Sequence, residues 1–124
     1  MKEQMRRRIE ATEMDAIRRA SRTSRRERIP NEIIKENMGV KETVTELIER
    51  KQLVWYGHVQ RMAEHRLPKK VMRWIPPEHR KRGRPKKTWI EGVRKSMSER
   101  GLDDEACNDR RHWQMGIGQR RRAF

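Results

Sequence analysis

The residues of this chain best suited to chemistry are cations, and they crowd into one short stretch. Residues 79–89 read HRKRGRPKKTW, and six of these eleven residues are Arg or Lys. Guanidinium and ammonium groups neutralise phosphates and release the counterions held around a nucleic acid. The stretch therefore predicts contact with a polyanion, either as a probe of a nucleic-acid groove or as a charged connection between two helices.

The centre of this stretch resembles an AT-hook. Its glycine lacks the side chain that would block a narrow minor groove, its proline keeps the backbone open, and its arginines suit the negative potential there. Contact with phosphates alone is the broader expectation, and A·T-selective insertion is the narrower one. The residues expected to contact nucleic acid, here and in the basic stretch just before it, are Arg66, Lys69, Lys70, Arg73, Arg80, Lys81, Arg82, Gly83, Arg84, Pro85, Lys86 and Lys87.

One tryptophan is a candidate for stacking on an unpaired base, because aromatic side chains can stack on a base of any sequence. Trp74 lies in the basic segment, where no helical pattern is evident. Trp55, Trp89 and Trp113 fall on predicted apolar helix faces, so we expect these three in the core.

Residue patterns for catalysis or metal binding are missing from the sequence. The four histidines and Cys107 have no paired Cys-x-x-Cys or His-x-x-x-His spacing. The carboxylates of Asp103, Asp104 and Glu105 come at a predicted helix start, where they cap backbone amides and complement the helix dipole. We therefore expect no catalytic residues, no metal, no cofactor and no enzymatic activity.

Charge is distributed unevenly along the chain. Of the net charge of +15, residues 66–100 carry +10, and residues 1–28 carry +5. Leu, Ile, Val and Phe together number 20 of 124 residues, so the core is expected to be thin. A local basic segment on a small helical scaffold predicts a nucleic-acid partner.

The cysteine content and the length of the apolar runs predict the cellular compartment and the absence of membrane contact. Cys107 is the only cysteine, so no internal disulfide can form. No apolar run approaches the length of a membrane span, and the basic start lacks the apolar stretch of a signal peptide. We expect an intracellular protein, nuclear or cytoplasmic and not secreted, without membrane contact.

The elements that must position the cations are helices. Apolar residues at helical spacing predict a helix over residues 3–20, and the stretch IPNEIIKENMG predicts a short one that ends at Gly39. Thr43 and Glu46 form a capping box that opens a longer helix, to about residue 62, with Val44, Trp55 and other apolar residues on one face.

Two further helices are predicted after the basic segment. Thr88 and Glu91 form a second capping box, and Gly101 should end the helix that it opens. Asp103 can cap a last helix that carries Trp113. Five helices and no strand predict an all-α fold of two loosely joined, partly disordered sub-modules with a basic Pro/Gly linker between them.

Several ordered stretches together resemble the C-terminal region of polyproteins from non-LTR (LINE-type) retrotransposons, downstream of the reverse-transcriptase palm. The stretches are RIEATEMDAIRRASRTSRRERIPNEIIKENMGV, LVWYGHVQRM, RLPKKVMRWIPP, RKRGRPKKTW and GLDDEACNDRRHWQMG, and residues 55–62 are the most specific. The resemblance implies a thumb-like helical segment over residues 1–65, a basic linker over 66–87, a terminal helical pair over 88–118 and a basic tail over 119–124. It also implies a role in holding template RNA or target DNA.

The catalytic positions of that family have no counterpart here. Tyr56 is followed by Gly57 and His58 where a polymerase would have aspartates, and zinc-knuckle cysteines are missing. The sequence thus predicts a non-catalytic, nucleic-acid-binding fragment derived from a retrotransposon. The alternative is a protein-interaction or non-functional relic, in which the apolar face of helix 43–62 needs the polymerase core as its partner.

Overall fold

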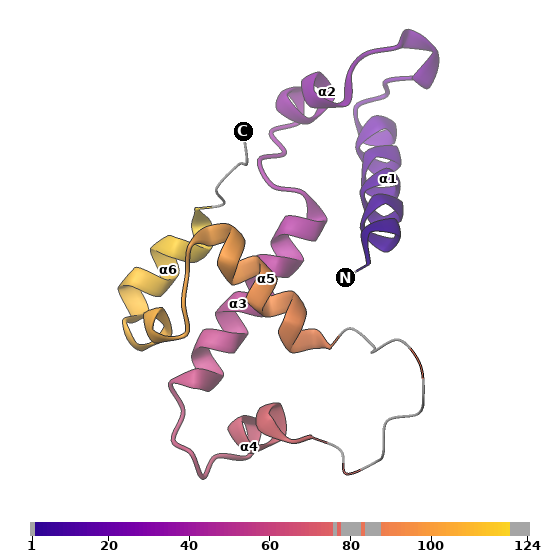
Figure 1. Cartoon of the computed structure of the whole chain (residues 1–124). Coiled ribbons are helices and arrows are strands. Elements are labelled where there is room, and N and C mark those ends of the chain that lie inside the picture. The colour runs from indigo at the N-terminus through magenta and orange to yellow at the C-terminus, as the bar shows by residue number, and fades with distance from the viewer. Residues whose placement is uncertain (1, 76, 78–82, 84–87, 120–124) are drawn as a thin grey trace. The chain divides into compact units, whose positions relative to one another are not determined.

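The computed structural model describes residues 2–75, 77, 83 and 88–119, and these residues form helices and connections without a strand. The all-α class is therefore confirmed (Figure 1). The elements are α1 (Glu3–Ala20), η1 (Arg25–Glu27), α2 (Asn31–Asn37), α3 (Val44–Gln60), α4 (Leu67–Arg73), α5 (Trp89–Arg100), η2 (Glu105–Asn108) and α6 (Arg110–Gly118), where η denotes a 3-10 helix.

The chain packs as two compact units, the N-terminal unit Met1–Glu49 and the C-terminal unit Arg50–Phe124. The boundary between them falls inside α3, upstream of the segment boundary expected after residue 65. The second half of α3 therefore belongs with the helices that follow it in the sequence.

The helix starts follow the predicted capping chemistry. The Thr43 amide donates to Glu46 Oε2 at 3.0 Å, and the Glu46 amide donates back to Thr43 Oγ1 at 3.3 Å. Thr88 and Glu91 form the second box at the start of α5. Each box satisfies amides that have no partner within the first turn, which is why both helices begin where the sequence places them.

The ends of three helices share one backbone motif. Gly39 after α2 and Gly101 after α5 lie in the left-handed region, with φ of +68° and +67°. After α1 the same position holds Arg22, with φ of +55°. There the Arg22 amide donates to the Arg19 carbonyl at 3.2 Å and the Thr23 amide to the Arg18 carbonyl at 3.0 Å, the paired bonds of a Schellman motif.

An apolar core holds the C-terminal unit together. It gathers buried side chains from the second half of α3, from α5, from η2 and from α6. Trp113 is its largest fully buried member, and its indole nitrogen donates to the Leu53 carbonyl at 3.1 Å. Gly57 makes this contact possible, since a Cβ there would lie 2.3 Å from Trp113 Nε1. The core residues are Leu53, Tyr56, Val93, Met97, Leu102, Cys107, Trp113 and Ile117.

The predicted face of α3 is partly wrong. Val59 is buried as expected, but Trp55 is 46% exposed, and Tyr56 enters the core in its place. Trp89 is also 40% exposed, and its ring meets that of Trp55 edge to face at 5.3 Å between centroids. Of the three tryptophans expected in the core, only Trp113 is fully buried, while the other two form a half-exposed pair.

The last predicted helix is in fact two pieces. Asp103 Oδ1 accepts from the Ala106 amide at 2.8 Å and so supports η2 rather than a longer helix. Asp109 caps α6 separately, accepting from the amides of Arg111 at 2.9 Å and His112 at 3.1 Å. Two capping aspartates therefore start two short helices where the sequence suggested one.

Polar contacts dominate in the N-terminal unit. Its buried apolar residues are few, namely Met14 and Ile34. Thr45, in the first turn of α3, is a fully buried polar residue. The Thr45 hydroxyl donates to Glu10 Oε1 at 2.7 Å, which ties the start of α3 to α1. Arg6 on α1 forms a second tie, an ion pair with Glu49.

Candidate nucleic-acid interface

The described part of the predicted basic segment is a short helix rather than an irregular linker. Helix α4 begins after Arg66, whose backbone is extended, and Pro68 occupies its first turn, where a missing amide costs nothing. The helix ends at Trp74, which is again extended. Between Trp74 and Thr88 the described residues are Ile75, Pro77 and Gly83.

Lys69 is not available for phosphate contact, and the prediction that it binds nucleic acid is corrected. Its side chain is 7% exposed, and Nζ donates to the Gln60 carbonyl at 2.9 Å and to the Met62 carbonyl at 3.0 Å. A third oxygen, Glu64 Oε1, lies 2.8 Å away. The ammonium thus caps the carboxyl end of α3 and fixes α4 against it, which is a positioning role.

Arg66, Lys70 and Arg73 are exposed, as a phosphate-contacting set requires. Arg73 pairs with Glu64, but its side chain is still 55% exposed, and ion pairs at that exposure are weak. The Lys69 hydrogen bond, together with the charges of Lys69 and Arg73, lowers the pKa of Glu64 below its usual value. The carboxylate is therefore charged at neutral pH, and it offsets one of the local cations.

The outer face of α4 combines charge with apolar surface. Leu67, Lys70, Val71 and Trp74 follow one another at helical spacings of three, one and three residues, so they share a face. Leu67 is 71% exposed, Val71 61% and Trp74 65%. Trp74 is thus accessible for stacking on a base. The exposed apolar strip as a whole is typical of a surface that binds a ligand or partner with an apolar surface.

Most of the AT-hook-like core lies outside the described residues. This applies to Arg80, Lys81, Arg82, Arg84, Pro85, Lys86 and Lys87. Gly83 is described: its φ of +148° is a conformation that favours glycine, and a Cβ there would meet nothing within 4 Å. A substitution at Gly83 would thus be opposed by backbone conformation rather than by crowding.

Two buried ionisable groups sit near the end of the C-terminal core. Burial, with a smaller effect of Asp104, raises the pKa of the Cys107 thiol to about 11. Burial and the hydrogen bond from the Tyr56 hydroxyl to Asp104 Oδ1, at 2.9 Å, raise the pKa of Tyr56 to about 12. Both groups are neutral at pH 7, and a buried thiol without thiolate character is a poor nucleophile.

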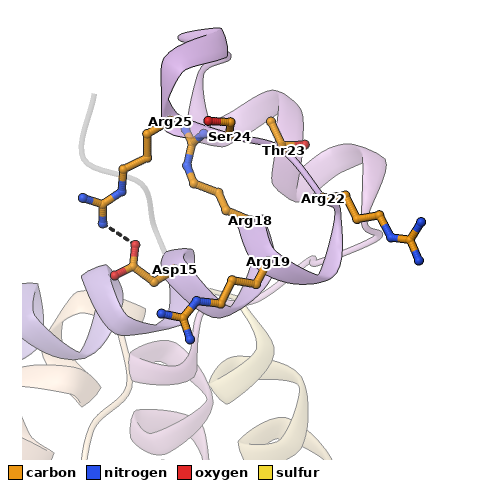
Figure 2. A pocket seen from close by; sticks show the side chains of 7 residues that line it. All are labelled: Asp15, Arg18, Arg19, Arg22, Thr23, Ser24 and Arg25. Atoms are coloured by element: carbon orange, nitrogen blue, oxygen red, sulfur yellow. Dashed lines mark hydrogen bonds and ion pairs between the residues drawn. The ribbon is translucent and has the colours of Figure 1, made fainter.

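A second basic surface, which was not predicted from the sequence, lies at the turn between α1 and η1. Here a pocket of about 380 Å³ is lined only by polar and charged residues (Figure 2). Arg25 turns toward Asp15 and pairs with it, whereas Arg22 extends away from the other labelled arginines. The lining residues, together called the arginine pocket below, are Asp15, Arg18, Arg19, Arg22, Thr23, Ser24 and Arg25.

Arg18 holds this turn in place. Its Nη2 donates to the Ile29 carbonyl at 2.7 Å and to Asn31 Oδ1 at 2.9 Å, which joins the end of α1 to the start of α2. Its Nη1 is buried and has no hydrogen-bond partner among the described residues.

A sequence signal for the arginine pocket did exist. Residues 1–17 have four cations and four carboxylates, so the whole +5 of residues 1–28 lies in residues 18–28, RRASRTSRRER. Six of those eleven residues are Arg, the same density of cations as in residues 79–89. Counting charge over a shorter window would have revealed a second basic stretch.

Within residues 2–75 and 88–119 no three His, Cys, Asp or Glu side chains gather in a metal-binding group. None of the described helices has the length and apolarity needed to cross a bilayer. Comparison of the chain with protein-family models, with curated proteins and with solved structures found no match.

Proposed function

We propose that this chain is a non-catalytic nucleic-acid-binding protein whose principal contact surface is the basic segment 66–87. The observation that carries the proposal is helix α4 with its two ends, where Arg66, Lys70, Arg73 and Trp74 are all exposed. Cations that neutralise phosphates beside an aromatic ring that stacks on bases are the combination that binds single strands.

The remaining cations of the segment belong to the proposal on the ground of the sequence alone. Arg80, Lys81, Arg82, Arg84, Lys86 and Lys87 are proposed to contact phosphates, with Gly83 and Pro85 shaping the backbone between them. Lys69 is left out of this set because its ammonium already caps α3. Descent from the C-terminal region of a LINE-type retrotransposon polyprotein belongs to the proposal too, and it rests on the sequence resemblance alone.

The test is a salt titration of binding to labelled 20-mers, as single-stranded RNA, single-stranded DNA and duplex DNA, followed by fluorescence anisotropy. If about six phosphates of a duplex are neutralised, the log–log slope of affinity against salt should be near −5. Replacing Arg66, Lys70 and Arg73 by Gln should make the slope shallower by roughly two to three. A slope indistinguishable from zero for the unmodified chain would refute the proposal.

A matched control removes three charges from the same unit. Arg94, Arg110 and Arg111 are exposed on α5 and α6, so replacing them by Gln subtracts equal charge without touching α4. This control should leave the salt slope within one unit of that of the unmodified chain. Trp74→Ala should weaken single-strand binding about tenfold, in line with the loss of one stacked base, and duplex binding far less.

A specific observation also favours a protein partner as a second function. Val54 and Trp55 on α3 and Trp89 on α5 are 44%, 46% and 40% exposed, and an apolar surface of this kind is typical of a docking site. The polymerase core of a parent element is the partner that the sequence resemblance implies. In the salt-titration assay, Trp55→Gln, which adds no charge, should leave nucleic-acid affinity unchanged if this surface serves protein contact instead.

A further inference from the structure

We propose that the arginine pocket of the N-terminal unit binds the phosphate monoester at the end of a nucleic-acid strand. This proposal rests on the proposed function for the class of ligand and adds a second site on a different unit of the chain. The chemistry of the pocket, rather than its place in the sequence, identifies the group that it would hold.

The charge of the pocket matches a doubly charged anion. Arg18, Arg19 and Arg25 contribute three positive charges and Asp15 subtracts one, while the Arg22 side chain extends away. A phosphate monoester carries between 1.5 and 2 negative charges at about pH 7, whereas a backbone phosphodiester carries only one. A net charge near +2 therefore favours a strand end over a phosphate within the strand.

The lining also supplies hydrogen-bond donors that suit the oxygens of a phosphate group. Guanidinium groups form forked pairs of hydrogen bonds with phosphate oxygens. The Ser24 hydroxyl accepts from the Arg26 amide at 3.2 Å, which leaves its own proton to donate. No apolar residue lines the pocket, so the groups that select its ligand are guanidinium groups, hydroxyls and one carboxylate.

Part of the site is already positioned. Arg18, one of the lining residues, is anchored by Ile29 and Asn31 through Nη2, so its guanidinium is held in place beside the pocket. Arg25 forms an ion pair with Asp15 at the same wall of the pocket. The exposed Arg19 side chain forms no hydrogen bond or ion pair among the described residues, so it is the side chain that would complete the binding of a ligand.

The experiment compares one oligonucleotide in two forms, with a 5′-phosphate and with a 5′-hydroxyl, bound to the full chain at ~150 mM salt. The 5′-phosphate form should bind about tenfold more tightly, the effect of one or two charge-assisted hydrogen bonds. Arg19→Gln should abolish that preference. Arg26→Gln, which removes the same charge from η1, should preserve it because the exposed Arg26 is not among the residues that line the pocket.

The outcomes separate this site from the one on α4. Equal binding of the two forms, or a preference that survives Arg19→Gln, overturns the pocket assignment while the α4 proposal stands. If neither form binds, the α4 proposal fails, and the pocket is tested by titrating inorganic phosphate against the Arg19 Nε–H signal in NMR spectra. A saturable shift that Arg19→Gln removes supports the pocket, and no shift overturns it.

The pH dependence provides a further check. Arginine stays charged throughout, whereas the phosphate monoester loses its second charge below a pKa of about 6. The preference for the 5′-phosphate form should therefore shrink between about pH 7 and pH 5. A preference that stays constant over this range overturns a site built for the dianion.

Discussion

The C-terminal and N-terminal units differ in how many apolar side chains they bury. In the C-terminal unit, helices far apart in sequence meet through Leu53, Val93, Trp113 and other apolar residues that exclude water. In the N-terminal unit, α1 is joined to later residues by hydrogen bonds and ion pairs such as Thr45–Glu10 and Arg6–Glu49.

This difference bears on function. Apolar burial is not directional, so it stabilises the C-terminal unit without fixing most of its cations. Arg66, Lys70 and Arg73 stay exposed, whereas Lys69 is buried. Hydrogen bonds are directional, and in the N-terminal unit they fix Arg18 beside a pocket. One unit thus presents a charged surface, and the other a charged cavity.

The largest effect should come from removing the centre of the apolar core. Trp113→Ala deletes a side chain that is 1% exposed, together with its hydrogen bond to Leu53, and should cost about 3–5 kcal/mol of unfolding free energy. Urea unfolding followed by circular dichroism measures the loss, and amide exchange should place it in α5 and α6 rather than in α1.

Trp74→Ala is the matched control, because Trp74 is 65% exposed. It should change the unfolding free energy by less than about 0.5 kcal/mol. Equal losses from the two substitutions would mean that the apolar core does not stabilise the C-terminal unit.

The next effect is a loss of stability at high pH that belongs to the C-terminal unit. The pKa of Tyr56 is raised from 10.0 to about 12 in the folded chain, mainly by burial. Its neutral form is favoured by folding, so the stabilisation is complete below pH 10 and declines as the pH rises toward 12. The decline should reach about 2 kcal/mol, measured by urea unfolding at a series of pH values.

Tyr56→Phe separates this titration from general alkaline unfolding. The phenyl ring retains the packing but loses the hydrogen bond to Asp104 and the ionisable group. The variant should be less stable at pH 7 and should show a shallower decline above pH 10. An unchanged decline would assign the alkaline instability to other residues.

A polar tie in the N-terminal unit should have an effect of similar or smaller size. Thr45→Val keeps the shape of a fully buried side chain but removes the donor to Glu10 Oε1. Losing a hydrogen bond to a charged group should cost about 1.5–2 kcal/mol. Thr12→Val is the control, since the exposed Thr12 hydroxyl donates only to the Arg8 carbonyl one turn earlier. A small loss at Thr45 would show that directional ties matter less than proposed.

Much of the helical framework was predictable because its signals are local. The Thr43–Glu46 and Thr88–Glu91 boxes and the left-handed Gly39 and Gly101 act within a few residues of each helix end. The bounds of α1 followed from the spacing of its apolar residues. These features depend on neighbours in sequence, which a pattern records directly.

The failures involve contacts between residues distant in sequence. Tyr56 and Trp55 are adjacent, and their apolar character does not reveal that Tyr56 finds an acceptor in Asp104 and enters the core. Lys69 reads as one more exposed cation until the backbone carbonyls at the end of α3 are in place around it. The arginine pocket likewise depends on the link from Arg18 to Ile29.

The smallest predicted effect is a gain, and it compares the helix ends of the two units. Gly39 and Gly101 adopt φ near +68° without a Cβ, whereas Arg22 holds φ of +55° with one, which costs roughly 1–2 kcal/mol. Arg22→Gly relieves that strain but increases the entropy lost on folding by about 0.5–1 kcal/mol. The net result should be a stabilisation of about 0.5–1 kcal/mol in urea unfolding, by the difference of these two terms.

Gly39→Ala should lower the free energy of unfolding by the reverse argument. Nothing lies within 4 Å of the added Cβ, so only the left-handed backbone conformation opposes the substitution. If Arg22→Gly instead lowers stability, the arginine contributes contacts that outweigh its strained backbone, and the turn beside the arginine pocket is held by its side chain.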